Sequence, residues 1–277
     1  MSALIVLRAS NLGDLQGKER SGPQCVSDVI NALLPHYPAM AAITSATTGT
    51  PGVAGINPAL LQSFRNYQYS TPVAGIELEF SSLKEIDDKT QHLNSSYDLI
   101  FVDPWHTYED SLLILELAIR LAKPESVILT HDCLTHNASL SSEYIPGAWS
   151  GVTCFVFREF AKTVKREYFV LDRDHGIGVL GPEVEHLNPA LNKVDVRNLE
   201  KLESENLLKF VANPREFMRG ISSTSFTSAM DLIERGESPA HLTALNPHEP
   251  VIKNSRIPLV RRYCRKLINF MRTLNKN

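Results

Sequence analysis

The chain of 277 residues has no stretch of about 20 consecutive apolar residues, the length that a membrane-spanning helix requires. Its start, Met1–Leu7, has a short apolar run but neither a basic region before it nor a small-residue cleavage site after it, so we expect no signal peptide. The cysteines follow neither zinc-knuckle nor redox-pair spacing, and they are Cys25, Cys133, Cys154 and Cys264. We therefore expect a cytoplasmic protein with reduced thiols.

Acidic residues are absent after Glu249, where every charged side chain is basic. The net charge of the whole chain is only −3, so this tail gives a near-neutral body a basic end. A tail of this kind suits an acidic partner surface, or it is simply a solvated helix face. Elsewhere the sequence lacks a basic stripe, so we expect no nucleic-acid partner. The sequence leaves the oligomeric state open, a homo-oligomer included.

Two short apolar runs stop abruptly at acidic and imidazole side chains. The first, Tyr97–Val102, leads to Asp103 and His106, and the second, Val127–Thr130, leads to His131 and Asp132. Buried parallel strands that carry a site at their carboxyl ends have this pattern. The segment between them, residues 111–122, has helical apolar spacing and closes with Lys-Pro. A strand, helix and strand joined in this way predict a right-handed βαβ unit that brings the four side chains to one edge of a sheet.

The rest of the first two thirds of the chain alternates strand and helix patterns. We predict a helix over residues 28–34 with Ser27 as its N-cap, and a strand over residues 40–46. Further predicted strands cover residues 53–56, 73–78, 168–172 and 177–180, and further helices cover residues 59–64, 83–93 and 149–160. The first twenty-odd residues fit no element. This alternation favours an α/β fold with a doubly wound, mostly parallel sheet.

The character of the chain changes near Gly181. We expect an α/β domain over residues 1–184 and a helical C-terminal extension over residues 185–277. The extension has helical spacing over residues 196–217 and 230–235, a Pro-rich linker over residues 239–258 and a basic terminal helix over residues 261–274.

The sequence from Asp103 to Glu109 reads Asp-Pro-Trp-His-Thr-Tyr-Glu, and the second strand ends in His131-Asp132. With Trp149-Ser150-Gly151 and the stretch over residues 172–179, these motifs resemble class I S-adenosylmethionine-dependent methyltransferases over roughly residues 27–180. More narrowly, they resemble a small-molecule and sugar O-methyltransferase branch in which strand four ends in Asp-Gly-x-His-x-Tyr-Glu and strand five ends in His-Asp.

The resemblance implies S-adenosylmethionine as the methyl donor and, in metal-dependent relatives, Mg²⁺. It makes Asp103 and Asp132 candidate metal ligands, with His131 at the other position of the strand-five pair, and it makes His106 the candidate general base. Because an imidazole stands where an acidic ligand is expected, a metal-free version with His106 or His131 as the base stays open.

The resemblance places the donor at the ends of strands one and two. Strand one is Met40–Thr44, with Ala42 and Thr44 where a glutamate and a glycine are expected. Strand two ends at Asn57, an amide where the family has a ribose-binding acid. The candidate donor-binding residues are therefore Thr44, Gly49, Asn57 and Asp103. A rival alignment that uses the strand ending at Glu77 supplies the acid but leaves too few residues before the next strand.

Methyl transfer from S-adenosylmethionine to a hydroxyl group of a small molecule or saccharide is the function that this resemblance implies. The departures at Ala42, Thr44 and Asn57 support an alternative, a cofactor-free methyltransferase-like scaffold in glycan or surface-polymer assembly. A third alternative is a metal-dependent hydrolase built on the four polar residues at the strand ends, although its ligand spacing is sparse.

Overall fold

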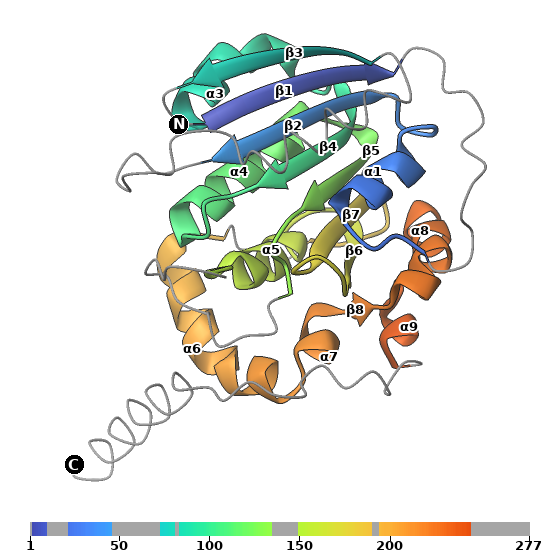
Figure 1. Cartoon of the computed structure of the whole chain (residues 1–277). Helices are drawn as coiled ribbons and strands as arrows, with labels where there is room; N and C mark the ends of the chain where they lie inside the picture. The colour runs from blue at the N-terminus through green and yellow to red at the C-terminus, as the bar shows by residue number, and fades with distance from the viewer. Residues whose placement is uncertain are drawn as a thin grey trace.

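A mixed sheet of eight strands forms the centre of the molecule (Figure 1). The structure, a computed structural model, describes residues 2–9, 22–45, 73–80, 83–134, 149–189 and 194–244. The strands follow the order β3-β1-β2-β4-β5-β7-β6-β8 across the sheet. Their bounds are β1 Ser2–Ala9, β2 Ala39–Ser45, β3 Val73–Phe80, β4 Tyr97–Asp103, β5 Ala122–Thr130, β6 Arg166–Leu171, β7 Ile177–Glu183 and β8 Gly220–Ile221.

Helices cover both faces of this sheet. The α-helices are α1 Val26–Leu33, α3 Leu83–Lys89, α4 Tyr108–Leu121, α5 Thr153–Ala161, α6 Val196–Ala212, α7 Pro214–Met218, α8 Phe226–Glu234 and α9 Ala240–Ala244. Two short 3-10 helices, η1 Gln91–Leu93 and η2 Ser223–Ser225, complete the described elements. The alternation of strands and helices, with helices on both faces of one sheet, confirms the predicted α/β class with a doubly wound sheet.

The middle of the sheet is parallel, and of the eight described strands β1 and β7 run opposite to the other six. β4 runs parallel to β2 on one side and to β5 on the other. β7 is antiparallel to both β5 and β6, and β1 is antiparallel to both β2 and β3. The carboxyl ends of β2, β4 and β5 therefore meet at one edge of the sheet.

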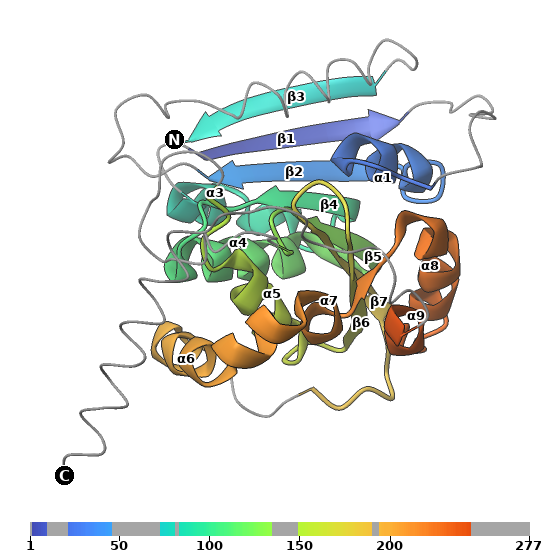
Figure 2. The same ribbon diagram turned by 60° about the horizontal axis from the view of Figure 1, so that its bottom comes forward.

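Alternate residues of β4 feed two separate apolar cores. Ile100 and Val102 pack with residues of α4, α5 and α6, whereas Leu99 and Phe101 pack with residues of α1 and α8. All four side chains are fully buried, as a strand covered on both faces requires. Figures 1 and 2 show α1 and α8 close together and away from α4 and α5. Because β4 is covered on both faces, its end is held firmly.

The crossover helix is confirmed, but it begins earlier than its apolar spacing predicts. α4 starts at Tyr108 because Thr107 caps it, and the Thr107 hydroxyl oxygen accepts a hydrogen bond of 3.2 Å from the Asp110 backbone N–H. The polar first turn precedes the apolar stripe, so periodicity alone misses it. The result is a short turn between Asp103 and α4, and this turn contains His106.

The predicted cap of the first helix is wrong. Ser27 lies inside α1, whose N-cap is Cys25, and Cys25 makes no capping hydrogen bond with its side chain. Two carboxylates serve this end of the helix instead: Asp28 accepts from the Gln24 backbone N–H at 2.9 Å, and Asp174 accepts from the Val26 backbone N–H at 3.0 Å. The second acceptor comes from a distant turn, so local sequence could not reveal it.

The N-terminal residues, which fit no element in the sequence, form β1 between β2 and β3. The predicted strand over residues 73–78 is confirmed as β3, at the edge of the sheet. The predicted strand over residues 53–56 and helix over residues 59–64 lie outside the described residues.

The segment after residue 184 returns to the sheet. It forms α6 and α7, then β8, which pairs in parallel with β6, and then α8, whose Phe226 and Met230 join the second core. The helical spacing over residues 196–217 and 230–235 is thus confirmed. The basic terminal helix predicted over residues 261–274 lies outside the described residues. No helix in the described part of the chain combines the length and the apolar character that crossing a membrane demands.

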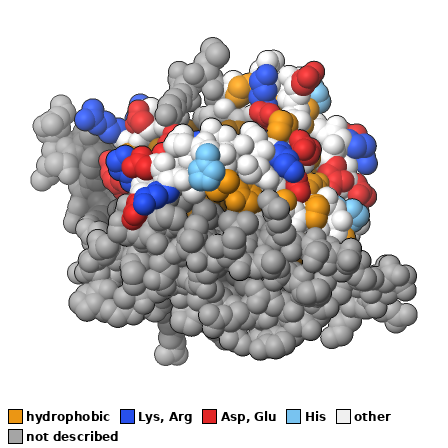
Figure 3. Space-filling view, turned by 90° about the horizontal axis from the view of Figure 1, so that it is seen from above, with side chains coloured by type: hydrophobic (Ala, Val, Ile, Leu, Met, Phe, Trp, Pro, Cys, Tyr) orange, Lys and Arg blue, Asp and Glu red, His pale blue; other side chains and the backbone are white. Residues whose placement is uncertain are grey.

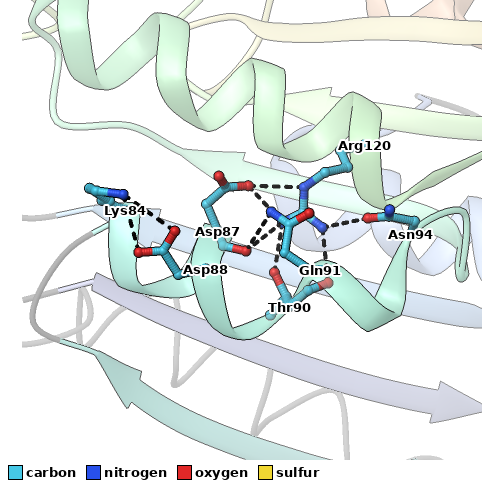
Figure 4. A network of polar contacts seen from close by, with 7 residues as sticks. All are labelled: Lys84, Asp87, Asp88, Thr90, Gln91, Asn94 and Arg120. Atoms are coloured by element: carbon cyan, nitrogen blue, oxygen red, sulfur yellow. Dashed lines mark hydrogen bonds and ion pairs between the residues drawn. The ribbon is translucent and has the colours of Figure 1, made fainter.

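Arg120 fastens α3 and η1 to the last turn of α4 (Figure 4). Its guanidinium donates hydrogen bonds to the Asp87 carboxylate at 2.9 Å, the Thr90 hydroxyl at 2.8 Å and the Asn94 side-chain oxygen at 2.6 Å. Two further bonds reach the backbone oxygens of Asp87 and Thr90. This network lies at the end of α4 remote from His106.

Figure 3 shows the molecule from above the view of Figure 1. Basic and acidic side chains are interspersed on the part of that surface that the structure describes. On those residues we therefore see no extended patch of one sign.

Candidate functional site

Adjacent, parallel strands bring the four predicted side chains together. β4 and β5 pair in register from Leu99 with Val127 to Val102 with Thr130, so both strands end at the same level. At that level His131 Nδ1 lies 3.5 Å from Asp103 Oδ1 and 3.3 Å from Asp132 Oδ2. His106 Nε2 lies 3.4 Å from the same Asp132 Oδ2. Asp132 is thus shared by the two imidazoles, as the sequence motifs led us to expect for one cluster.

The backbone after β5 orients His131 and Asp132. The His131 N–H donates to the Val102 carbonyl oxygen at 3.0 Å, which extends the β4–β5 ladder by one residue. Asp132 then adopts a left-handed conformation with φ +58°. Aspartate tolerates this region better than most residues because its short side chain forms local polar contacts. The turn places the Asp132 carboxylate against both imidazoles.

Residues 149–153, which lead into α5, contact His106. The Val152 N–H donates to the His106 carbonyl oxygen at 3.0 Å, and Thr153 Oγ1 lies 3.3 Å from His106 Nδ1. Gly151 has φ +50°, and a Cβ atom there would lie 2.1 Å from the His106 carbonyl oxygen, so only glycine fits. The Trp149 ring meets the His106 ring edge-on at a centroid distance of 5.2 Å. These contacts fix the position and the plane of the imidazole.

A hydrogen-bonded chain continues from His106 into the core. Ser111 Oγ of α4 lies 3.2 Å from Thr153 Oγ1 of α5, and both residues are fully buried. The Thr153 hydroxyl can therefore accept from His106 Nδ1–H while it donates to Ser111. In that tautomer the lone pair lies on His106 Nε2; in the other, Nε2–H points to Asp132 Oδ2 at 3.4 Å and the Thr153 hydroxyl donates to Nδ1.

Asp174, in the turn between β6 and β7, is a member of the cluster that the sequence analysis missed. Its Oδ1 lies 3.8 Å from His131 Nε2, and its Oδ2 accepts from the Val26 N–H at the start of α1. His175 beside it meets the His131 ring edge-on at 6.3 Å. The signal was an Asp-His-Gly turn before a closing strand, but only the sheet order shows that this turn faces β5.

The pKa values of His106 and His131 are shifted in opposite directions. Burial lowers the pKa of His106 more than the charges of Asp132 and Asp103 raise it, so this imidazole is neutral at pH 7. Burial also lowers the pKa of His131, but the nearby carboxylates of Asp103, Asp132 and Asp174 outweigh it and raise the pKa well above the usual value. Burial raises the pKa of Asp132, yet its contacts with His131 and His106 give a net lowering. A neutral histidine and a strongly paired one therefore share Asp132.

Three of these residues can offer ligand atoms to one cation. One atom each from Asp103, His131 and Asp132 lies within 4.8 Å of the others, and the side chains are 13%, 18% and 11% exposed. Asp103 and Asp132 are the predicted metal ligands, and His131 contributes nitrogen rather than oxygen to the set. The three side chains are thus largely buried, each with a small exposed fraction.

The predicted donor-binding residues are described only in part. The backbone of Thr44 pairs with that of Asp103, so β2 ends at the same edge as the cluster. Ala42, where the family pattern has an acid, is fully buried in the core. Gly49 and Asn57 lie outside the described residues.

Residues 68–133 match the family model described as a methyltransferase domain. The matched segment spans β3, β4, α4 and β5, and it includes Asp103, His106, His131 and Asp132. No curated protein matches the chain. A crystal structure of a protein from Corynebacterium glutamicum is similar with 17% identity over 36% of this chain and 46% of that one, at a TM-score of 0.28. The chain thus matches less than half of that protein's length.

Proposed function

We propose that this protein, through the methyltransferase domain matched over residues 68–133, transfers the methyl group of S-adenosylmethionine to a hydroxyl group of a small molecule or saccharide. The observation that carries the proposal is the cluster of two carboxylates and two imidazoles where β4 and β5 end. In open α/β sheets, ligands bind outside the carboxyl ends of the strands. The reaction needs positioning and a base, and this cluster offers both.

The charge at this edge suits the donor. S-adenosylmethionine, when bound, supplies a methyl group on a positively charged sulfur. Asp103 is partly exposed at the end of β4, beside the end of β2, and its carboxylate would attract that cationic end of the donor. Asp103 is therefore the described residue that we assign to donor binding.

His106 is the proposed general base. With Nδ1–H donated to Thr153, its Nε2 lone pair would receive the proton of the acceptor hydroxyl as the carbon–sulfur bond breaks and the carbon–oxygen bond forms. Asp132, 3.4 Å from Nε2, would then stabilise the imidazolium. S-adenosylhomocysteine and the methyl ether are the products. His131, held by three carboxylates, is the weaker candidate for this role.

A substitution of His106 tests this assignment. We expect His106→Ala to reduce S-adenosylhomocysteine formation by about 10²–10⁴-fold with a panel of phenols, polyols and monosaccharides, because the base is lost. S-adenosylhomocysteine affinity, measured by calorimetry, is expected to stay within about twofold, because the base does not hold the donor. His92→Ala, an exposed histidine in η1, is the matched control. Undiminished turnover in His106→Ala would remove this residue from the mechanism.

Donor binding is tested separately. We expect S-adenosylhomocysteine to bind with a dissociation constant of about 1–100 μM and Asp103→Asn to weaken it about tenfold, since one charged partner is lost. Absence of heat and of any thermal shift at millimolar ligand would reject the enzyme and favour the scaffold alternative, which the buried Ala42 on β2 supports.

A further inference from the structure

The cation that the family resemblance implies is Mg²⁺, and the donor set of this cluster does not suit it. Mg²⁺ prefers oxygen ligands in octahedral geometry and keeps several waters. Here His131 Nδ1 faces the space shared with Asp103 Oδ1 and Asp132 Oδ2 at 3.5 Å and 3.3 Å, so an imidazole nitrogen occupies one of the three protein positions. Imidazole favours first-row transition metals over Mg²⁺.

The other nitrogen of the same ring gives an independent indication. His131 Nε2 is buried and has no hydrogen bond among the described residues, and Asp174 Oδ1 lies 3.8 Å from it. A histidine that ligates a metal usually donates its second ring N–H to a carboxylate, which fixes the tautomer and the ring orientation. Asp174 is placed for that task, because its Oδ2 is already tied to the Val26 N–H of α1.

We infer that Asp103, His131 and Asp132 form a site for a transition-metal dication rather than for Mg²⁺, with Asp174 as the positioning residue that orients His131. Its parts come from three places in the fold: the end of β4, the turn after β5 and the β6–β7 turn. Asp174 is a positioning residue because it acts through the imidazole. The inference concerns the site of the proposed methyl transfer, and it is tested without donor or acceptor, so failure of one is distinguishable from failure of the other.

Cation selectivity is the readout. The purified chain of 277 residues, treated with a chelator, is titrated calorimetrically with Co²⁺ and with Mg²⁺. We expect Co²⁺ to bind at least about 100-fold tighter than Mg²⁺ in the wild type. Because every site of this kind favours Co²⁺ to some degree, the decisive quantity is the change in that ratio in His131→Asp. An oxygen in place of the nitrogen is expected to lower the ratio about tenfold and to shift the visible absorption of bound Co²⁺.

Asp174→Asn tests what the Asp174 carboxylate, which lies near His131 Nε2, contributes to cation affinity. The Asn side-chain oxygen can still accept from the Val26 N–H, so the start of α1 keeps its partner. We expect Co²⁺ affinity to fall about tenfold or more, with Mg²⁺ affinity changed less, because only the imidazole ligand loses its orientation. Asp28→Asn, a second carboxylate at the start of α1, is the matched control and is expected to leave both affinities unchanged.

The outcomes are separable. No Co²⁺ binding at millimolar concentration, or the same Co²⁺-to-Mg²⁺ ratio in the wild type and in His131→Asp, would overturn the inference and leave the cluster as an ion-pair network. Unchanged Co²⁺ affinity in Asp174→Asn would overturn the role of Asp174. His131→Asn, which also offers an oxygen, replaces His131→Asp if thermal unfolding shows that the latter does not fold.

Discussion

Asp132 combines a backbone role and a charge role at one position. Its left-handed backbone turns the chain after β5, and its carboxylate contacts both His106 and His131. The carboxylate is buried with only 11% of its side chain exposed, so its partners matter more than solvent does. Substitutions can separate the two roles, because asparagine keeps the backbone preference without the charge.

We predict that Asp132→Ala destabilises the protein by about 1 kcal/mol more than Asp132→Asn, since alanine tolerates a φ of +58° poorly. Both variants remove the charge and are expected to lose turnover. Urea unfolding followed by circular dichroism measures the difference. Equal stabilities would show that the backbone strain at this position is negligible.

The sequence predicts the four residues of the cluster that follow β4 and β5, but not the residues of other elements that contact them. Asp103 and the His131-Asp132 pair follow apolar runs directly, His106 comes three residues after Asp103, and parallel strands bring such ends together. Thr153 and Asp174 lie in other elements, and they reach the cluster only through the packing of α5 on α4 and the pairing of β7 with β5. Nothing in local spacing encodes either contact.

At the scale of elements, α4 connects the site at the carboxyl end of β4 to the opposite end of the strands, where β5 begins. Thr107 fixes its start next to His106, and Arg120 fixes its last turn to α3 and η1. The two ends are about 20 Å apart, at 1.5 Å per residue over the helix. Stability and ligand binding can therefore be changed independently at opposite ends of one helix.

We predict that Arg120→Lys destabilises the protein by about 1–3 kcal/mol and leaves S-adenosylhomocysteine affinity unchanged. A lysine ammonium cannot reproduce the guanidinium fork that reaches Asp87, Thr90 and Asn94 together (Figure 4). Chemical denaturation and calorimetry on the same preparation measure the two quantities. A stability loss below about 0.5 kcal/mol would mean that the network is solvated in solution.

The boundaries of elements were predicted less well than their order. The apolar stripe of α4 begins after its polar first turn, and the start of α1 depends on Asp174 from a distant turn. β1 contains the short apolar run that ends at Leu7, but the run alone does not assign a strand, and its pairing with β2 and β3 defines it. Tertiary contacts, which sequence periodicity does not contain, set these limits.

At the scale of the molecule, the C-terminal segment closes the fold instead of only following it. α6 joins the core on one face through Leu199 and Phe210, and α8 joins the core on the other face through Phe226 and Ile233. β8 adds a strand to the edge. The sequence indicated helices here, but not that they would cover both faces.

Glu203 on α6 makes the stability of the whole fold depend on pH. Burial raises its pKa from 4.5 to about 7. Because the folded state binds this proton more tightly than the unfolded state, stability from this group is fully present below pH 4.5 and falls as pH rises through 7. We predict that Glu203→Gln gains about 1 kcal/mol over the wild type at pH 8, a value reduced for partial solvent contact, and nothing at pH 4.

Thermal unfolding at pH 4, 6 and 8 tests this dependence, with Glu200→Gln, exposed on the same helix, as the control. The melting temperature of Glu203→Gln is expected to exceed that of the wild type by a few degrees at pH 8 only. A constant difference across the three pH values would contradict a raised pKa for the partly buried Glu203 carboxyl.

A crystal structure of the protein with S-adenosylhomocysteine tests the central claim most directly. We predict the thioether sulfur at the edge where β2 and β4 end, beside Asp103 and on the side of His106 Nε2. The ligand bound elsewhere on the molecule, or side chains of the protein itself filling the space beside Asp103 and His106, would contradict the account.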